Sequence, residues 1–296
     1  MRKLIFALLL IATPTWATNA NILVSIKPLQ LLISSLTEGE QTVEYLISPN
    51  VSPHDYALRP SDVRRIRQAD LVIWVGDELE PFLSKPLSQT QRAQLALLEL
   101  KDLQLISGEK AHQQHQHAEH HHEVDPHIWL GPAESRVIAK AITEQLIKFN
   151  PEQRIHLQQQ LQRFNQRLDQ LNKKIDQQLR PVKQQGYFVF HDGYSYFERQ
   201  FKLNRLGEFT INPQRRPGAK TLQYIRQNLE QGSAQCIFAE PQFDGALLHT
   251  ISEDSGAKIG LLDPLGIAVV PNAQSYFQLL QNMADAYRNC LSSEQA

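Results

Sequence analysis

The chain has little net charge, little cysteine and no long apolar segment. Its 296 residues include 30 lysines and arginines against 31 aspartates and glutamates, which gives a formal net charge of −1. This balance offers no electrostatic attraction to nucleic acid or to an anionic membrane surface, so neither partner is predicted. No stretch approaches the about 20 consecutive apolar residues that a transmembrane helix requires. At this length we expect one large domain or two of ordinary size.

Two common signatures of hydrolytic enzymes are also missing. The sequence holds neither the HExxH element of zinc proteases nor the GxSxG turn of serine hydrolases. A zinc-dependent hydrolase stays open as an alternative function, because three histidines and a water also form catalytic zinc centres. In such an enzyme Glu240 is the candidate general base, although a structural carboxylate is the preferred interpretation.

The first twenty residues have the layout of a secretory signal peptide. Arg2 and Lys3 give a basic start, residues 4–12 are almost all apolar, and residues 15–17 or 18–20 offer a cleavage site that ends in alanine. The apolar run is too short to span a bilayer. We therefore expect residues 1–20 to be removed on export and the mature chain to be soluble.

Only two residues, Cys236 and Cys290, carry thiols, and they lie 54 positions apart (290 minus 236). An oxidising compartment favours a disulfide between them. Loop-closure reasoning gives such a bond roughly 4 kcal/mol of stabilisation. Two separate buried thiols are the alternative.

Strand and helix patterns alternate along most of the chain. Strands are predicted at residues 22–26, 43–47, 71–75, 187–190, 236–239 and 259–262, and helices at residues 28–36, 60–68, 194–201 and 275–290. This alternation predicts an α/β fold with mostly parallel sheets. In the middle of the chain, seven apolar residues recur at steps of three and four within residues 157–179. They predict one long helix over residues 151–180, with a coiled-coil pair as the alternative.

The pattern divides the chain into four parts. These are the signal peptide (1–20), an N-terminal α/β lobe (21–150), the linking helix (151–181) and a C-terminal α/β lobe (182–296). Ligands of such sheets bind in the crevice beyond the carboxyl ends of the strands, so a site is expected in the cleft between the lobes. A long stiff helix between the lobes implies small relative movements.

A run of eleven residues at 112–122, HQQHQHAEHHH, contains six histidines. Imidazole is a frequent ligand of zinc, copper and nickel, so the run predicts metal contact, with a solvated linker as the alternative. Nothing in the run sets a coordination geometry. Its histidines are therefore expected to be auxiliary ligands in a loop at residues 109–123; they are His112, His115, His117, His120, His121 and His122.

Three further histidines, His54, His127 and His191, each lie where a strand or extended segment meets a loop. Such positions converge at the crevice of an α/β fold, which makes the three candidates for one metal site. Each of them alone would also fit a hydrogen-bonded structural role. His156 and His249 lie in helical stretches and are expected at the surface.

Four ordered motifs resemble those of the metal-binding receptors of bacterial ATP-binding-cassette importers. They are SPHDYALRPSD at 52–62, DPHIWL at 125–130, FHDGYSYF at 190–197 and LDPLG at 262–266. The resemblance covers nearly all of the expected mature chain, including the linking helix and a histidine-rich insertion before the second motif. It implies a site with His54, His127 and His191 as ligands and with Asp263 or water in the fourth position. A turn-capping role is the alternative for Asp263.

The zinc receptors of that family resemble the chain most. Zinc members have histidine in the third motif, whereas manganese members usually have a carboxylate, and the two cysteines resemble a disulfide of zinc members. Three imidazoles and one oxygen also suit tetrahedral zinc. One departure is Pro53, where some zinc members have a glutamate, so no glutamate ligand is expected there.

The resemblance implies a periplasmic, monomeric receptor that is not an enzyme. It would pass zinc to a permease of the inner membrane, which works with a cytoplasmic ATPase. A receptor for manganese or another divalent metal is one alternative. A zinc buffer or metallochaperone that relies on the histidine-rich run is another.

Overall fold

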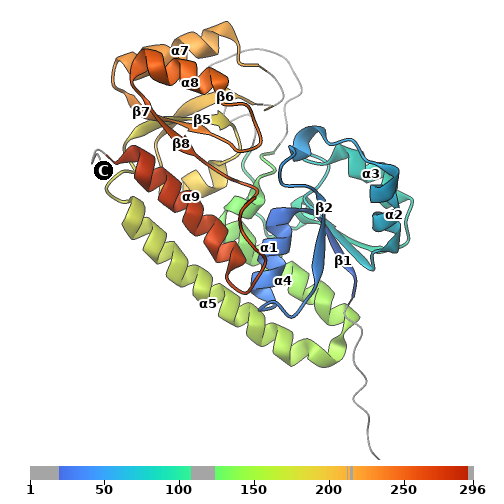
Figure 1. The fold of residues 1–296 in the computed structure, drawn as a ribbon. Coiled ribbons are helices and arrows are strands. Elements are labelled where there is room, and N and C mark those ends of the chain that lie inside the picture. Colours follow the sequence, from blue (N-terminus) through green and yellow to red (C-terminus); the bar gives the residue numbers. More distant parts are fainter. Residues whose placement is uncertain (1–19, 108–123, 212, 214–215, 293–296) are drawn as a thin grey trace, which may run out of the picture.

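Two four-stranded sheets form the framework of the molecule (Figure 1). The computed structural model describes residues 20–107, 124–211, 213 and 216–292. The first sheet has the order β2-β1-β3-β4 and the second the order β6-β5-β7-β8, and all paired strands run parallel. This arrangement confirms the predicted α/β fold with two lobes. The strands are β1 (Ile22–Ile26), β2 (Val43–Ile47), β3 (Leu71–Trp74), β4 (Ala93–Ala96), β5 (Gly186–His191), β6 (Arg205–Thr210), β7 (Ala234–Ala239) and β8 (Lys258–Leu261).

Helices connect the parallel strands. Several of them open with proline, which suits the first turn because the N–H that proline lacks has no partner there; examples are α2 and α4. The helices are α1 (Lys27–Leu36), α2 (Pro60–Gln68), α3 (Pro81–Ser88), α4 (Pro132–Phe149), α5 (Arg154–Leu179), α6 (Ser195–Phe201), α7 (Ala219–Glu230), α8 (Ala246–Ser255) and α9 (Ser275–Leu291). Short 3₁₀ turns η1 (Pro53–Asp55) and η4 (Ile128–Leu130) lie near the cleft between the lobes.

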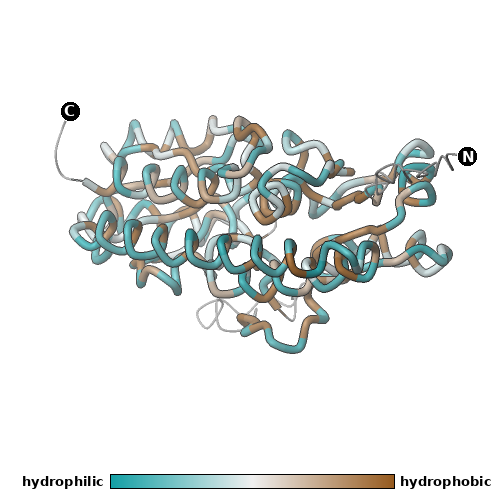
Figure 2. Tube along the Cα trace, turned by 90° about the horizontal axis from the view of Figure 1, so that it is seen from below, coloured by the Kyte–Doolittle hydropathy of each residue, from teal (hydrophilic) through white to brown (hydrophobic). Residues whose placement is uncertain are grey.

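The long helix α5 runs along one side of both lobes (Figure 1). It has 26 residues, so at 1.5 Å per residue it is roughly 39 Å long. The predicted apolar stripe faces the core, since Leu157, Phe164, Leu168, Ile175 and Leu179 are buried and the other two members pack beside them. The remaining faces are polar. Figure 2 shows the resulting alternation of hydrophilic and hydrophobic residues along the helices of this side.

One apolar core extends through both lobes. It contains residues of both sheets as well as the buried faces of α1, α4, α5 and α9. Helix α9 follows the second sheet in the chain but packs against both α1 and α5. A smaller cluster fills the space between the second sheet and helices α7 and α8. The predicted boundaries at residues 150 and 181 therefore remain a prediction, because packing crosses from one lobe to the other.

A disulfide joins Cys236 of β7 to Cys290 of α9. It links an inner strand of the second sheet to the helix that covers that sheet. This bond confirms the favoured pairing and rules out two separate thiols.

Two predicted segments lie outside the described residues. They are the signal peptide at residues 1–20, of which only the last residue is described, and the histidine-rich run at residues 112–122. In the part of the chain that the structure covers, none of the helices combines the length and apolar character needed to cross a membrane.

Candidate metal site

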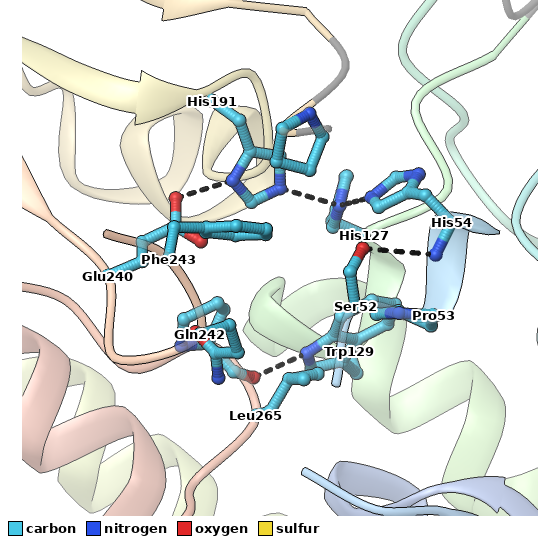
Figure 3. A pocket seen from close by; sticks show the side chains of 12 residues that line it. Ser52, Pro53, His54, His127, Trp129, His191, Glu240, Gln242, Phe243 and Leu265 are labelled. Carbon is cyan, nitrogen blue, oxygen red and sulfur yellow. Dashed lines mark hydrogen bonds and ion pairs between the residues drawn. The ribbon is translucent and has the colours of Figure 1, made fainter. Parts of the chain in front are cut away.

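The fold brings His54, His127 and His191 together from distant parts of the chain (Figure 3). His54 lies in η1, which follows β2, and its backbone N–H donates to Ser52 Oγ. His127 immediately precedes η4 in the first lobe. His191 is the last residue of β5, an inner strand of the second sheet. The carboxyl ends of strands thus supply two of the three positions, as expected for a ligand site in this class of fold.

The three imidazoles point toward a common centre. The Nε2 atom of His127 lies 3.2 Å from Nε2 of His54 and 3.2 Å from Nε2 of His191. Among the described residues, the ligand atoms of these three histidines all lie within 4.8 Å of one another. Four ligands placed tetrahedrally at 2.0–2.1 Å from a zinc ion are separated from each other by roughly 3.3 Å. The two spacings of 3.2 Å therefore match those of ligands on a tetrahedral zinc ion.

The space at this centre is small and mostly apolar around the imidazoles. The cavity has a volume of about 20 Å³, which is room for one water-sized occupant. Its walls include Trp129 and Pro53 from the first lobe and Phe243 and Leu265 from the second. The ring of Trp129 lies 5.2 Å from that of His127. Such apolar walls limit the access of water to the centre of the site.

Gly193 provides the space that an ion needs. A Cβ atom at this position would lie 2.5 Å from Nε2 of His191 and 3.2 Å from Nε2 of His127. Any side chain here would therefore occupy the centre of the site. Sequence reasoning did not assign a role to Gly193; its only signal is its place two residues after a strand-end histidine.

A carboxylate holds each of the two most buried histidines. His127 and His191 are each 3% exposed. Nδ1 of His127 donates to Oδ1 of Asp125 at 2.8 Å, and Nδ1 of His191 donates to Oε1 of Glu240. A neutral imidazole with its proton on Nδ1 has its lone pair on Nε2. Both rings are thus oriented with their free nitrogens toward the cavity.

The electrostatic surroundings favour a cation at this place. Burial lowers the pKa of His191, but the charge of Glu240 and its hydrogen bond raise that pKa more, so the net shift is upward from 6.5. A positive charge is therefore stabilised at this imidazole, whether it comes from a proton or from a metal ion.

Asp263 does not join the histidine group. It follows β8, and its carboxylate accepts hydrogen bonds from the backbone N–H of Leu265 at 3.2 Å and of Ile267 at 2.6 Å. The residue thus caps its own turn, which is the alternative interpretation of the LDPLG motif. Burial raises its pKa against the effect of these hydrogen bonds. These hydrogen bonds agree with a turn-capping role, and the choice between Asp263 and water in the fourth ligand position stays a prediction.

Other candidate residues also lie apart from the centre. Asp192 follows His191 directly, but Arg205 and Ser195 donate to its Oδ1 at 2.5 Å and 3.2 Å, so its charge is already engaged. His156 lies on α5, and its Nε2 atom is 2.7 Å from a carboxylate oxygen of Glu40. His249 is exposed on α8. The predicted surface positions of His156 and His249 agree with the structure.

Solved structures of similar fold include a zinc-bound ZnuA and a periplasmic zinc-binding protein. A zinc-bound deletion mutant of ZnuA superposes with a TM-score of 0.79 at 23% identity, covering 94% of this chain and 100% of that one. The periplasmic zinc-binding protein TroA from Treponema pallidum also gives 0.79 at 21% identity, with 93% and 99% coverage. At this identity the likeness shows the fold alone. Two α/β lobes with a histidine centre between them thus define the class of fold.

Sequence relatives specify the family within this class. The family described as ZnuA, zinc-uptake complex component A, periplasmic, matches residues 22–290. The high-affinity zinc uptake system protein ZnuA of Yersinia pestis is 41% identical, covering 96% of this chain and 95% of its own length. The corresponding protein of Haemophilus ducreyi is 39% identical, with 98% and 99% coverage. This chain belongs to the ZnuA family.

Proposed function

We propose that this protein is an extracytoplasmic receptor that captures zinc in the cleft between its lobes and delivers it to an ABC-type permease. The observation that carries the proposal is the convergence of three Nε2 atoms, two of them 3.2 Å from the third, on one small cavity. The family membership supports the same cargo and the same transport role. His54, His127 and His191 are the proposed ligands, with Asp263 or water as the fourth.

Donor chemistry favours zinc over manganese. The group of ligand atoms consists of imidazole nitrogens alone. Manganese prefers carboxylate oxygens and a larger number of ligands, and it stands lower in the affinity order of divalent metals. Tetrahedral zinc is satisfied by three nitrogens and one water in a cavity of this size.

A role as a zinc hydrolase finds less support. A hydrolase needs a general base that is free to take a proton from the metal-bound water. Glu240, the candidate base, already accepts the Nδ1 proton of His191. The protein is therefore proposed to act by binding and release, without chemistry at the ion.

The proposed setting is the periplasm. Residues 1–20 are proposed to be a signal peptide that is removed on export, and the mature chain to be a monomer. It would dock on a permease in the inner membrane whose cytoplasmic ATPase drives uptake. The histidine-rich run at residues 112–122 is proposed to supply auxiliary zinc contacts.

Metal analysis combined with anomalous scattering tests the proposal. Protein purified without added metal should contain up to one zinc per chain, and crystals should show anomalous density among the three imidazoles. Calorimetric titration of the metal-free protein should show one tight zinc site. Absence of density between the rings, or a tight site elsewhere, would overturn the assignment.

A further inference from the structure

Each of the two buried histidines is paired with a carboxylate from its own lobe. Asp125 belongs to the first lobe with His127, and Glu240 to the second lobe with His191. We propose that Asp125 and Glu240 are positioning residues that fix both imidazoles for zinc and together balance the charge of the ion. The inference rests on the proposed function, because it assigns how that same site obtains its affinity.

The second sheet itself sets the pairing of Glu240 with His191. Strands β5 and β7 are parallel neighbours, and their register places Val189 beside Phe238. Two residues further along each strand, His191 and Glu240 therefore emerge at the same level. Glu240 is 3% exposed, so solvent does not compete for its carboxylate. Figure 3 shows its oxygen directed at Nδ1 of His191 on the side away from the cavity.

Asp125 holds His127 by two contacts to a single oxygen. Its Oδ1 accepts from the backbone N–H of His127 at 2.9 Å and from Nδ1 at 2.8 Å. The backbone of Asp125 is held in turn, since Tyr196 of the second lobe donates to its carbonyl at 2.8 Å. The other carboxylate oxygen, Oδ2, is buried and has no hydrogen-bond partner among the described residues. A cation at the centre of the site would be a favourable neighbour for this unpartnered oxygen.

Charge balance gives these residues a role beyond orientation. Three neutral imidazoles leave the charge of a divalent ion uncompensated, and both carboxylate side chains are almost wholly buried, at 6% and 1% exposure. Two carboxylates match two positive charges in surroundings where solvent screens weakly. A hydrogen-bonded carboxylate also makes the imidazole a stronger donor to the metal.

The test compares variants of Glu240 that separate its hydrogen bond from its charge. Glu240→Ala removes both, and zinc affinity should fall about 10- to 100-fold, the usual effect of losing an outer partner of a metal ligand. Glu240→Gln keeps an acceptor oxygen for Nδ1 but lacks the charge, so its affinity should fall between those of the wild type and the alanine variant. Asp125→Asn should behave like Glu240→Gln. Affinity is measured at fixed pH by competition with a chromophoric chelator.

Glu80 offers a matched control. It is a carboxylate that is 0% exposed and accepts the backbone N–H of Val75 at 2.8 Å, but it is not a partner of the histidine group. Glu80→Gln should leave zinc affinity unchanged. Cobalt provides the second readout: the tetrahedral d–d absorption of the Co²⁺-loaded protein should be altered in Glu240→Ala and retained in Glu80→Gln. A merely structural role of Glu240 would lower thermal stability without changing that spectrum.

The outcomes separate this inference from the proposed function. In one outcome the wild type binds zinc, His191→Ala does not, and both Glu240→Ala and Asp125→Asn match the wild-type affinity within about twofold. The positioning role is then wrong, and the receptor function stands. If His191→Ala binds zinc as the wild type does, the metal site itself is wrong. Should Glu240→Ala fail to fold, Glu240→Gln decides, because wild-type affinity and spectrum in that variant would overturn the charge role.

Discussion

Nε2 of His191 lies 3.2 Å from Nε2 of His127, although the two residues are 64 positions apart and belong to different lobes. Each lobe contributes one nitrogen of this pair, so neither lobe by itself provides both. The affinity of the site for zinc therefore depends on the relative placement of the lobes, which is fixed by a common apolar core.

Loss of a ligand should remove tight binding. In His54→Ala, His127→Ala or His191→Ala, zinc affinity should fall by more than about 100-fold, beyond the effect of losing an outer partner. Competition titration measures the change. His249→Ala is the control, since His249 is exposed and outside the group; retention of wild-type affinity by His191→Ala would exclude a site between the lobes.

Gly193→Ala should block the centre of the site. Its methyl group would lie 2.5 Å from Nε2 of His191. Gly193 does not have a positive φ, so alanine meets no backbone strain there and the fold should be kept. Extra volume in a packed site costs roughly 1–3 kcal/mol, which corresponds to a loss of affinity between about fivefold and about 100-fold.

Gly245→Ala is the control for this substitution. The added Cβ would also face a histidine, but its nearest atom, Cδ2 of His249, is 3.6 Å away, an ordinary contact. Zinc affinity should stay at the wild-type value. Circular dichroism of both variants checks the fold, and equal affinities for Gly193→Ala and the wild type would contradict the placement of the ion.

Zinc affinity should fall with decreasing pH. Protons compete with the metal for imidazole nitrogen. Because Glu240 raises the pKa of His191 above 6.5, despite the lowering by burial, the loss should begin at a higher pH than for an ordinary imidazole. Affinity measured between about pH 5 and about pH 7.5 should rise steadily, and a flat profile would contradict histidine ligation.

In the metal-free protein, the free energy of unfolding should depend on pH in the direction opposite to that of zinc affinity. A pKa that is raised on folding adds stability below the unfolded value, and this contribution disappears as the pH rises through the folded value. The free energy of unfolding attributable to His191 should thus decline toward alkaline pH, and Glu240→Gln should weaken that dependence. Urea unfolding of metal-free protein at several pH values measures it.

Deletion of residues 112–122 should leave the tight site intact. The three proposed ligands and both carboxylates lie outside that run. Titration calorimetry should show the same tight binding with fewer weak sites, and the capture rate could fall. If the deletion abolished the tightest binding, a buffer function based on the run would be favoured instead.

Reduction of the disulfide should lower the free energy of unfolding but have little effect on zinc affinity. Cys236 lies near the start of β7, whereas Glu240 follows its opposite end. Loop-closure reasoning predicts a loss of roughly 4 kcal/mol in the free energy of unfolding. Zinc affinity of the folded, reduced protein should stay close to that of the oxidised protein. Thiol labelling of unfolded, unreduced protein should find no free thiol.

Apolar patterning predicted the inner strands well but missed helices α3, α4 and α7. Strands β1 and β2 and helix α2 have the expected bounds, and the long helix begins after a short 3₁₀ turn at Pro151. The strands that were not predicted, β4 and β6, both lie at sheet edges. They are covered less completely and carry polar residues or glycine, so their sequences lack a continuous apolar run.

The candidate site was predicted in part. Strand-end positions and motif resemblance identified the three histidines, but spacing along the chain cannot reveal that their Nε2 atoms meet. Asp263 fits a ligand by its motif, and only the structure shows that its carboxylate also accepts backbone hydrogen bonds within its own turn. The partnership of Glu240 with His191 depends on the register between β5 and β7, which no local pattern encodes.

The packing of α9 on both α1 and α5 has a consequence for cargo exchange. Wide separation of the lobes would strip apolar side chains of their neighbours along the whole length of the molecule. Loading and unloading must then proceed as ligand substitution at a single ion, with imidazoles and water replacing one another in turn. Discrimination among metals accordingly resides in coordination preference, and the polypeptide serves as a frame whose shape is already set before the ion arrives.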